Sequence, residues 1–189
     1  MIDMDSRLRI AHGIAKTENL ASVEVFQILK RRGHPDSPQP MVSNGWGGID
    51  DAMVEIYGVV PECKGRGRPP TIKRPRSDWQ YLQVVKNREN GRVVGIKPRV
   101  IYGDKDKVVE LMGKSTVYVE RTHLTMRTFN SRLTRKTLAF SKLLDMYMAS
   151  AAFDDIIYNI VRLLKSLRVE RFNDPIRRWI PRLLQWRLD

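Results

Sequence analysis

Two apolar runs on either side of an Asn-Gly dipeptide constrain the fold of this chain more than any other feature. Residues 79–86 and 92–102 are rich in Val, Ile and Tyr, which favour an extended backbone. Asn90-Gly91 lies between the two runs, and this dipeptide favours the two-residue turn that joins antiparallel strands. The sequence therefore predicts a β-hairpin near the middle of the chain.

Helical patterns lie on both sides of the predicted hairpin. Residues 18–32 carry regularly spaced apolar side chains, with Thr17 or Asn19 as the cap and Gly33 at the end. Further helices are predicted at about 49–58, 104–113, 120–148 and 150–167, and extended segments at 1–16 and 41–43. The sequence therefore predicts helices on both sides of the hairpin, together with short extended segments.

The charge of the chain is strongly basic and unevenly distributed. The 189 residues have a net charge of +13 and an isoelectric point near 10.2. Residues 1–60 hold 6 Lys or Arg and 8 Asp or Glu, a net of −2, so the rest of the chain holds +15. This concentration of positive charge indicates a polyanionic partner and favours nucleic acid over a uniformly solvated surface.

Composition also excludes several classes of protein. No apolar run approaches the roughly 18–20 residues of a membrane span, and no secretory signal is visible. The single cysteine, Cys63, allows neither an internal disulfide nor a cysteine-based metal cluster. We therefore expect a cytoplasmic protein that does not bind membranes.

Residues 61–77 are rich in proline, glycine and basic side chains, and we expect an exposed loop. The Arg-Gly-Arg-Pro core at residues 66–69 resembles an AT-hook, in which glycine lets the backbone lie deep in a narrow minor groove. General phosphate contact and a merely solvated loop are the alternatives. The candidate DNA-binding residues here are Arg66, Arg68, Lys73, Arg74 and Arg76.

The segment from Ser115 to Lys142 contains a single carboxylate, Glu120, at the start of a predicted basic helix. At about 100° per residue, Glu120 and Arg127 share one stripe. Arg135 and Lys142 are expected on an adjoining part of the same face, and Arg121 is a further candidate DNA-binding residue. The pattern suits a metal-binding carboxylate followed by phosphate-binding cations. It equally suits a glutamate that interacts with the helix dipole in front of a solvated basic face.

The sequences YVERTHLTMR and RLTRKTLAFSK resemble the C-terminal signature of DDE transposases of the insertion-sequence-one-like group. SNGWGG, GRGRPP, DWQYLQVVK, GRVVGI, RVIYGDK and YNIVRLLKSLR also resemble members of this group. The resemblance extends from about Ile2 to Arg182. It implies a bacterial, nucleoid-associated protein of mobile DNA, with transposon ends and target DNA as partners.

The resemblance implies an RNase-H-like α/β domain, a mixed sheet with flanking helices, that is incomplete here. Residues 1–168 would form the partial catalytic domain, with the AT-hook-like loop at 64–77 as an insertion and helices toward the C-terminus. Residues 169–189 would form an irregular tail. Family members cut and join DNA with two Mg²⁺ or Mn²⁺ ions held by three carboxylates. Glu120 matches the third carboxylate, a metal ligand, and Arg127 matches a cation that contacts DNA.

The chain departs from the family at the other two carboxylates. Asn44 stands where the family has its second aspartate, and an amide cannot supply the charge that holds two divalent ions together. The first aspartate of the family lies upstream of the region that matches Ile2 to Leu8. We expect Asp3 and Asp5 to be turn carboxylates and not its substitutes, and the loss of the upstream strand to expose a sheet edge.

The C-terminal part departs as well. Leu163-Leu164 replaces a Pro-His pair of the family, and residues 183–189 fit the family's tail read with a one-base shift, so we expect a frameshifted end. Asp154 and Asp155 are expected on a solvated helix face.

Three functions follow: an impaired transposase that still binds DNA, a transposase-derived regulator that forms homo-oligomers or mixed oligomers with a full-length copy, or a nuclease with an unusual metal set.

Overall fold

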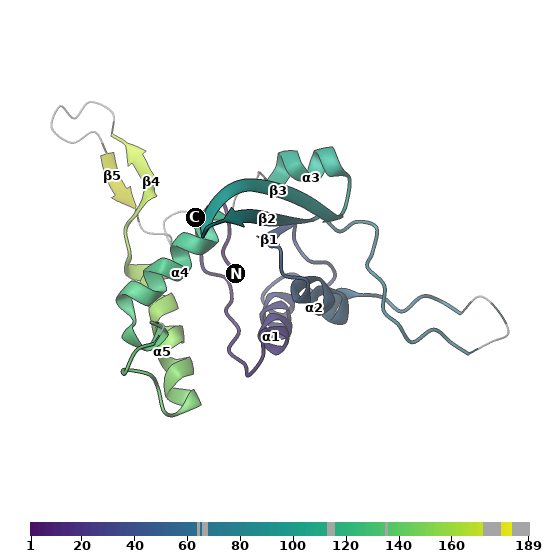
Figure 1. Cartoon of the computed structure of the whole chain (residues 1–189), viewed down its shortest axis with the longest axis horizontal. Coiled ribbons are helices and arrows are strands. Elements are labelled where there is room, and N and C mark those ends of the chain that lie inside the picture. Colours follow the sequence, from purple (N-terminus) through teal and green to yellow (C-terminus); the bar gives the residue numbers. More distant parts are fainter. Residues whose placement is uncertain (64, 66–67, 113–115, 135, 172–178, 183–189) are drawn as a thin grey trace. The chain divides into compact units, whose positions relative to one another are not determined.

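The computed structural model describes the whole chain except residues 64, 66–67, 113–115, 135, 172–178 and 183–189. The chain divides into two compact units (Figure 1). The sheet unit comprises Ala11–Thr116, and the helical unit comprises Met1–Ile10 together with Val117–Asp189. Every helix in the described ranges is too short or too polar to traverse a lipid bilayer.

A three-stranded mixed sheet forms the centre of the sheet unit. Strand β1 (Met41–Asn44) runs parallel to β2 (Tyr81–Glu89), and β2 pairs antiparallel with β3 (Arg92–Tyr102). Asn90 and Gly91 both adopt positive φ angles, 48° and 78°, as the predicted two-residue turn requires. The hairpin and the α/β class are therefore confirmed, with one parallel strand pair in a mixed sheet.

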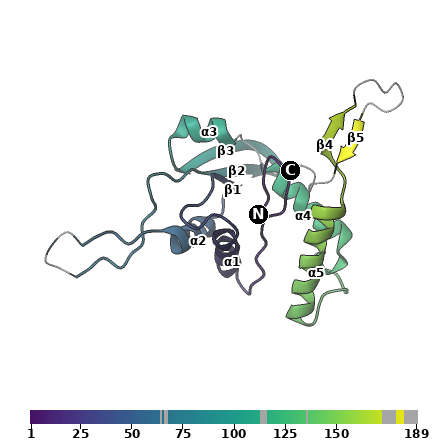
Figure 2. The same ribbon diagram turned by 180° about the vertical axis from the view of Figure 1, so that it is seen from behind.

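Helices cover both faces of this sheet. Figures 1 and 2 show α3 (Lys105–Met112) on one face and α1 (Glu18–Arg31) with α2 (Gly48–Tyr57) on the other. Residues 81–84 of β2 are all buried, as expected for a strand covered on both sides. Leu82 and Val84 pack against Val108 of α3 and form the core of that layer.

Local signals explain where α1 begins and ends. The hydroxyl of Thr17 accepts a hydrogen bond from the backbone N–H of Leu20 at 3.3 Å, which caps the helix as predicted. The helix ends before Gly33, whose φ of +134° favours glycine. The rings of Phe26 in α1 and Tyr57 in α2 meet edge to face at 6.3 Å and hold the two helices together.

The prediction of one long helix over residues 120–148 is wrong, because two helices occupy this part of the helical unit. Helix α4 (Val117–Phe129) ends just before Asn130, a 3₁₀ turn η1 (Ser131–Leu133) follows, and α5 (Leu144–Ile156) begins after a non-helical segment. The side chain of Asn130 accepts a hydrogen bond from the backbone N–H of Arg132 at 3.2 Å. This local bond competes with helix continuation and explains the break.

The helix predicted over residues 150–167 is also only partly present. Helix α5 passes into a π-helical turn η2 (Ile157–Val161), and strand β4 (Leu164–Glu170) follows and pairs antiparallel with β5 (Trp179–Arg182).

At the other end of the sequence, Ile2 and Arg9 form an isolated antiparallel bridge. The carboxylate of Asp3 accepts hydrogen bonds from the N–H and the hydroxyl of Ser6, so Asp3 is a turn carboxylate, as expected.

Candidate functional site

Helix α4 carries the predicted catalytic glutamate and two predicted DNA-binding cations on its surface. Glu120, Arg121 and Arg127 are all exposed. Glu120 lies in the first turn of the helix and Arg127 in the last, on one stripe two turns apart. The arrangement of carboxylate and cation predicted for this stripe is therefore present within α4.

His123 lies between Glu120 and Arg127 on α4, and its pKa depends on the charges around it. Desolvation lowers the pKa of His123 below its ordinary value of about 6.5, and the positive charges of the N-terminal amino group, Arg127 and Arg9 lower it further. Glu120 acts in the opposite direction, but its effect is the smallest of these. His123 is therefore mainly neutral near pH 7, and the fixed charges of this face come from the arginines and Glu120.

The break after α4 changes the position of the other two cations predicted for this face. Lys142 is exposed but lies in the non-helical segment before α5, so it does not continue the stripe of Glu120 and Arg127. The expected continuation is wrong for Lys142 because the helix ends at Phe129. Arg135 lies outside the described residues.

Asn44 is the last residue of β1 and is exposed. Its backbone pairs with Val84 in the parallel register, so it lies at the carboxyl end of a parallel strand, where α/β proteins commonly bind ligands. Its side-chain oxygen accepts a hydrogen bond from the backbone N–H of Trp46 at 3.4 Å, at the start of the turn into α2. Asn44 belongs to the sheet unit, and Glu120 belongs to the helical unit.

The donor groups for a divalent metal are sparse. In the part of the chain that the structure describes, no group of three or more His, Cys, Asp or Glu side chains is arranged to hold a metal ion. The side chain of Asn44 offers a neutral amide oxygen, which contributes no charge. These residues do not fit a site that holds two Mg²⁺ or Mn²⁺ ions.

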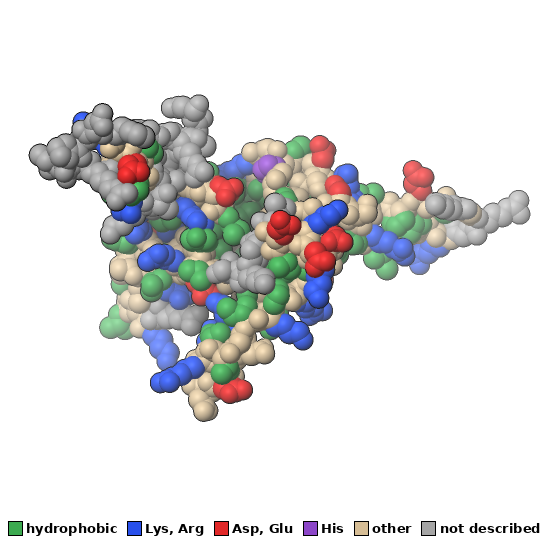
Figure 3. All heavy atoms as spheres, turned by 90° about the horizontal axis from the view of Figure 1, so that it is seen from above, with side chains coloured by type: hydrophobic (Ala, Val, Ile, Leu, Met, Phe, Trp, Pro, Cys, Tyr) green, Lys and Arg blue, Asp and Glu red, His purple; other side chains and the backbone are tan. Residues whose placement is uncertain are grey.

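The basic loop is closed at its base by backbone pairing. Val59 and Arg74 exchange two backbone hydrogen bonds, of 3.0 and 2.9 Å. Figure 3 shows Lys and Arg side chains, in blue, grouped where this loop leaves the rest of its unit. Arg68, near the tip, is exposed, while Arg66 lies outside the described residues.

Two basic side chains of the loop also contact the protein itself. The ammonium group of Lys73 donates to the carbonyl of Glu55 in the last turn of α2, as basic residues often do at helix C-termini. Arg76 forms an ion pair with Asp78, with Nε and Oδ1 3.3 Å apart. Both side chains are exposed, so they can contact a ligand while they hold the base of the loop in place.

A cluster around Arg9 was not anticipated from the sequence. The Arg9 side chain is 3% exposed, and its Nη1 atom lies 2.6 Å from Oδ2 of Asp154 and 3.2 Å from Oδ1 of Asp155. The guanidinium carbon lies 3.8 Å from the centre of the Tyr158 ring. The expectation that Asp154 and Asp155 occupy a solvated face is therefore wrong, because both neutralise a buried arginine.

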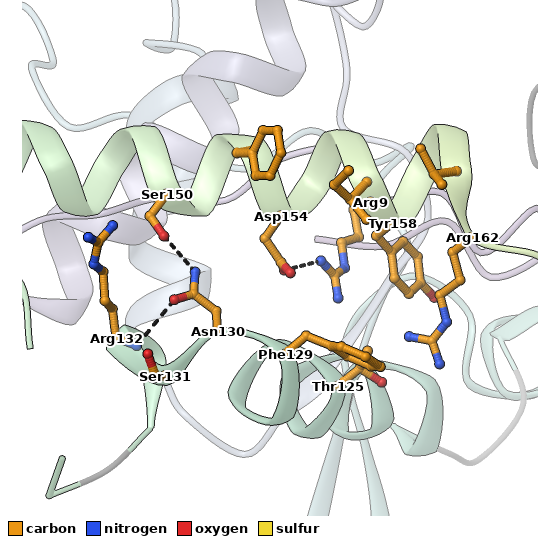
Figure 4. Close-up of a pocket in the computed structure, with 13 residues that line it drawn as sticks. Arg9, Thr125, Phe129, Asn130, Ser131, Arg132, Ser150, Asp154, Tyr158 and Arg162 are labelled. Atoms are coloured by element: carbon orange, nitrogen blue, oxygen red, sulfur yellow. Dashed lines mark hydrogen bonds and ion pairs between the residues drawn. The ribbon is translucent and has the colours of Figure 1, made fainter. Parts of the chain in front are cut away.

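Arg9 also borders a pocket in the helical unit, shown in Figure 4, with a volume of about 560 Å³. Asn130 and Ser150 tie the two sides of the pocket together through a 2.8 Å hydrogen bond. Residues far apart in sequence build this site, so no local pattern could have predicted it.

The chain matches no protein-family model, no curated protein and no solved structure.

Proposed function

We propose that this chain binds DNA as a transposase-family protein with an incomplete RNase-H-like domain. It derives from an enzyme of DNA cleavage and strand transfer and is impaired in cleavage. The observation that carries the proposal is the exposed stripe of α4, where Glu120 and Arg127 keep the spacing of the family signature. Cations on a helix surface contact phosphate oxygens and fix the position of a protein on DNA.

The second support is the basic loop, which offers exposed cations in a different unit. Arg68, Arg74 and Arg76 are exposed, and no acidic residue interrupts residues 64–77. A loop of this kind contacts phosphates in any duplex and reads the narrow minor groove of A·T-rich DNA if its glycine-arginine core inserts there. The proposed partner is therefore double-stranded DNA.

Impaired cleavage follows from Asn44. Two divalent ions close together require several carboxylates, and the amide of Asn44 contributes no charge. The same observation supports a second candidate function, a DNA-binding regulator without enzymatic activity. Such a regulator would inhibit a full-length copy by competing for its DNA or by forming mixed oligomers with it.

DNA binding is tested by the salt dependence of affinity for a labelled duplex. The logarithm of the binding constant falls linearly as log[salt] rises, and each phosphate contact contributes about 0.9 to the steepness of this fall. Replacing both Arg121 and Arg127 with Ala should therefore make the slope shallower by about two units. Arg92→Ala removes an exposed arginine of β3 and serves as the control. An unchanged slope in the double variant, equal to that of the control, would exclude α4 from the DNA interface.

Cleavage is tested on supercoiled plasmid with Mg²⁺ or Mn²⁺. We expect no cleavage by the wild-type chain and a partial gain, at most, in Asn44→Asp. Cleavage by the wild type that disappears in Glu120→Gln would contradict the impaired site. Inhibition of a full-length transposase by the wild-type chain, without cleavage of its own, would favour the regulator.

A further inference from the structure

The pocket of the helical unit has features of a ligand site that the proposed function does not use. Its walls come from the end of α4 and the turn after it on one side, and from α5 and the π-helical turn on the other (Figure 4). Its volume, about 560 Å³, lies within the range of small-molecule sites. π-Helical turns occur frequently at functional sites, and this one contributes Ile157, Tyr158 and Val161 to the lining.

Arg9 lines the pocket and has unused hydrogen-bond donors. Its Nη1 atom donates to Asp154 and Asp155, but Nε and Nη2 are buried and have no hydrogen-bond partner among the described residues. These two atoms lie on one edge of the guanidinium, so together they suit a group with two acceptors. A buried donor without a partner is costly, and an acceptor from a ligand would remove that cost.

Aromatic rings and a second arginine surround the rest of the pocket. Phe129 is 72% exposed, so most of its ring is open to contact. The guanidinium carbon of Arg162 lies 5.4 Å from the Phe129 ring centre and 5.5 Å from that of Tyr158. In the described part of the chain, the Arg162 guanidinium has these ring contacts and no ion pair, so its charge is available to an anion.

The charges of the lining favour an anionic ligand with an aromatic part. Three arginines, Arg9, Arg132 and Arg162, line the pocket, and the carboxylates of Asp154 and Asp155 both pair with Arg9, so a net positive charge remains. Nucleic-acid bases stack on aromatic rings and on guanidinium planes, while phosphates pair with arginine. An uncharged apolar ligand would use neither the buried donors of Arg9 nor the excess of positive charge.

From these contacts we infer that the pocket binds one unpaired nucleotide of a DNA strand. The base lies against Phe129 with an acceptor edge toward Arg9, and the phosphate pairs with Arg162. The inference rests on the proposed DNA binding. It adds a site for a base that has left the duplex, whereas the stripe of α4 and the basic loop contact the duplex backbone.

The test compares three labelled DNAs of one sequence: a duplex with one unpaired nucleotide, the same duplex with an abasic residue at that position, and a fully paired duplex. The wild-type chain should bind the first about tenfold more tightly than the second, as expected for one stacked base. Phe129→Ala should reduce this ratio to near one. Arg162→Ala should weaken binding of both the unpaired nucleotide and the abasic residue and leave their ratio close to tenfold, because the abasic residue keeps its phosphate. Affinity for the paired duplex should change little in Phe129→Ala.

Two control variants match the test variants. Phe140→Ala removes an exposed ring of the same unit that does not line this pocket, and Arg92→Ala removes an exposed arginine of the sheet unit. Both should keep the tenfold ratio. The wild-type comparison of base with abasic residue needs no substitution, so it remains decisive even if a variant fails to fold.

The outcomes separate the pocket from the proposed function. If the wild type binds the paired duplex but does not distinguish base from abasic residue, the pocket inference is overturned and DNA binding stands. If it binds none of the three DNAs, both are overturned. A ratio that survives in Phe129→Ala but falls in Phe140→Ala would place the base elsewhere and also overturn the inference.

Discussion

Arg9 donates a 2.6 Å hydrogen bond from Nη1 to Oδ2 of Asp154, a residue 145 positions away in the chain. The two side chains are 3% and 14% exposed, so this ion pair is largely removed from water. Arg9 thereby joins the N-terminal segment to helix α5. Removing one partner of such a pair leaves the other charge buried, which is more costly than removing both.

Asp154→Asn should therefore destabilise the protein by about 3 kcal/mol, the lower end of the range for broken buried pairs, because Asp155 still accepts from Arg9. Urea unfolding followed by circular dichroism measures this change. Asp145→Asn, an exposed carboxylate in the first turn of the same helix, is the control and should cost less than about 1 kcal/mol. Equal effects of the two substitutions would contradict the role of the buried pair.

Asn159 makes a second connection to the same segment. Its side-chain oxygen accepts from the Arg9 N–H and its side-chain nitrogen donates to the Arg9 carbonyl, both at 3.0 Å. Asn159→Asp keeps the acceptor but loses the donor, so we expect a loss of about 1–3 kcal/mol and faster amide hydrogen exchange at Arg9. Asn87→Asp, on an exposed position of β2, is the control for the added charge. Unchanged exchange at Arg9 in Asn159→Asp would show that this connection does not hold the segment.

The sequence predicted best those features that depend on neighbouring residues. The Asn90-Gly91 turn, the Thr17 cap and the end of α1 before Gly33 each follow from the conformational preferences of a few adjacent positions. The end of α4 depends on equally local chemistry at Asn130, but the apolar and basic periodicity around it favoured a continuous helix.

Features that depend on distant residues were missed. Nothing near Arg9 in the sequence indicates that it pairs with Asp154 and Asp155, because the pairing requires the chain to return over some 145 residues. The same applies to the pocket, whose walls combine Arg9 with residues 125–162. The positions of Glu120 and Arg127 on one stripe were predictable because helical geometry alone decides them.

The pKa of His123 provides a test of the α4 face in solution. We expect a midpoint below about 6.5 in an NMR titration of its imidazole, because desolvation and then nearby positive charges disfavour the protonated form. Arg127→Gln should raise this midpoint, and Glu120→Gln should lower it further. A midpoint that responds to neither substitution would contradict the proximity of the three side chains.

The direction of the resulting pH dependence follows from proton binding. Between the pKa of His123 in the folded state and about 6.5, the unfolded chain binds more protons than the folded chain. The contribution of His123 to stability is therefore fully present above about pH 6.5 and is lost as the pH falls through the folded-state pKa. His123→Gln should remove this component from the pH dependence of unfolding.

Tyr102 provides the corresponding test in the sheet unit. Burial raises its pKa above the ordinary value of about 10, and the hydrogen bond from its hydroxyl to Oδ1 of Asp50, at 2.5 Å, raises it further. In an ultraviolet titration, Tyr102 should remain protonated while exposed tyrosines ionise, and its stabilising contribution should be lost only above about pH 10. Asp50→Asn should lower the midpoint of Tyr102. An unchanged midpoint would exclude Asp50 as a cause.

Gly91 and Gly95 form a matched pair for testing the hairpin turn. A Cβ atom added at either position would meet no atom within 4 Å, so neither substitution is limited by space. Gly91 has a φ of +78°, whereas Gly95 lies within β3 and has no positive φ. Gly91→Ala should destabilise the protein by about 1 kcal/mol, because an L-residue is strained at positive φ. Gly95→Ala should be neutral or stabilising by about 0.5 kcal/mol, because alanine restricts the unfolded chain. Urea unfolding of the two variants measures the difference, and a larger loss at Gly95 than at Gly91 would contradict the left-handed turn.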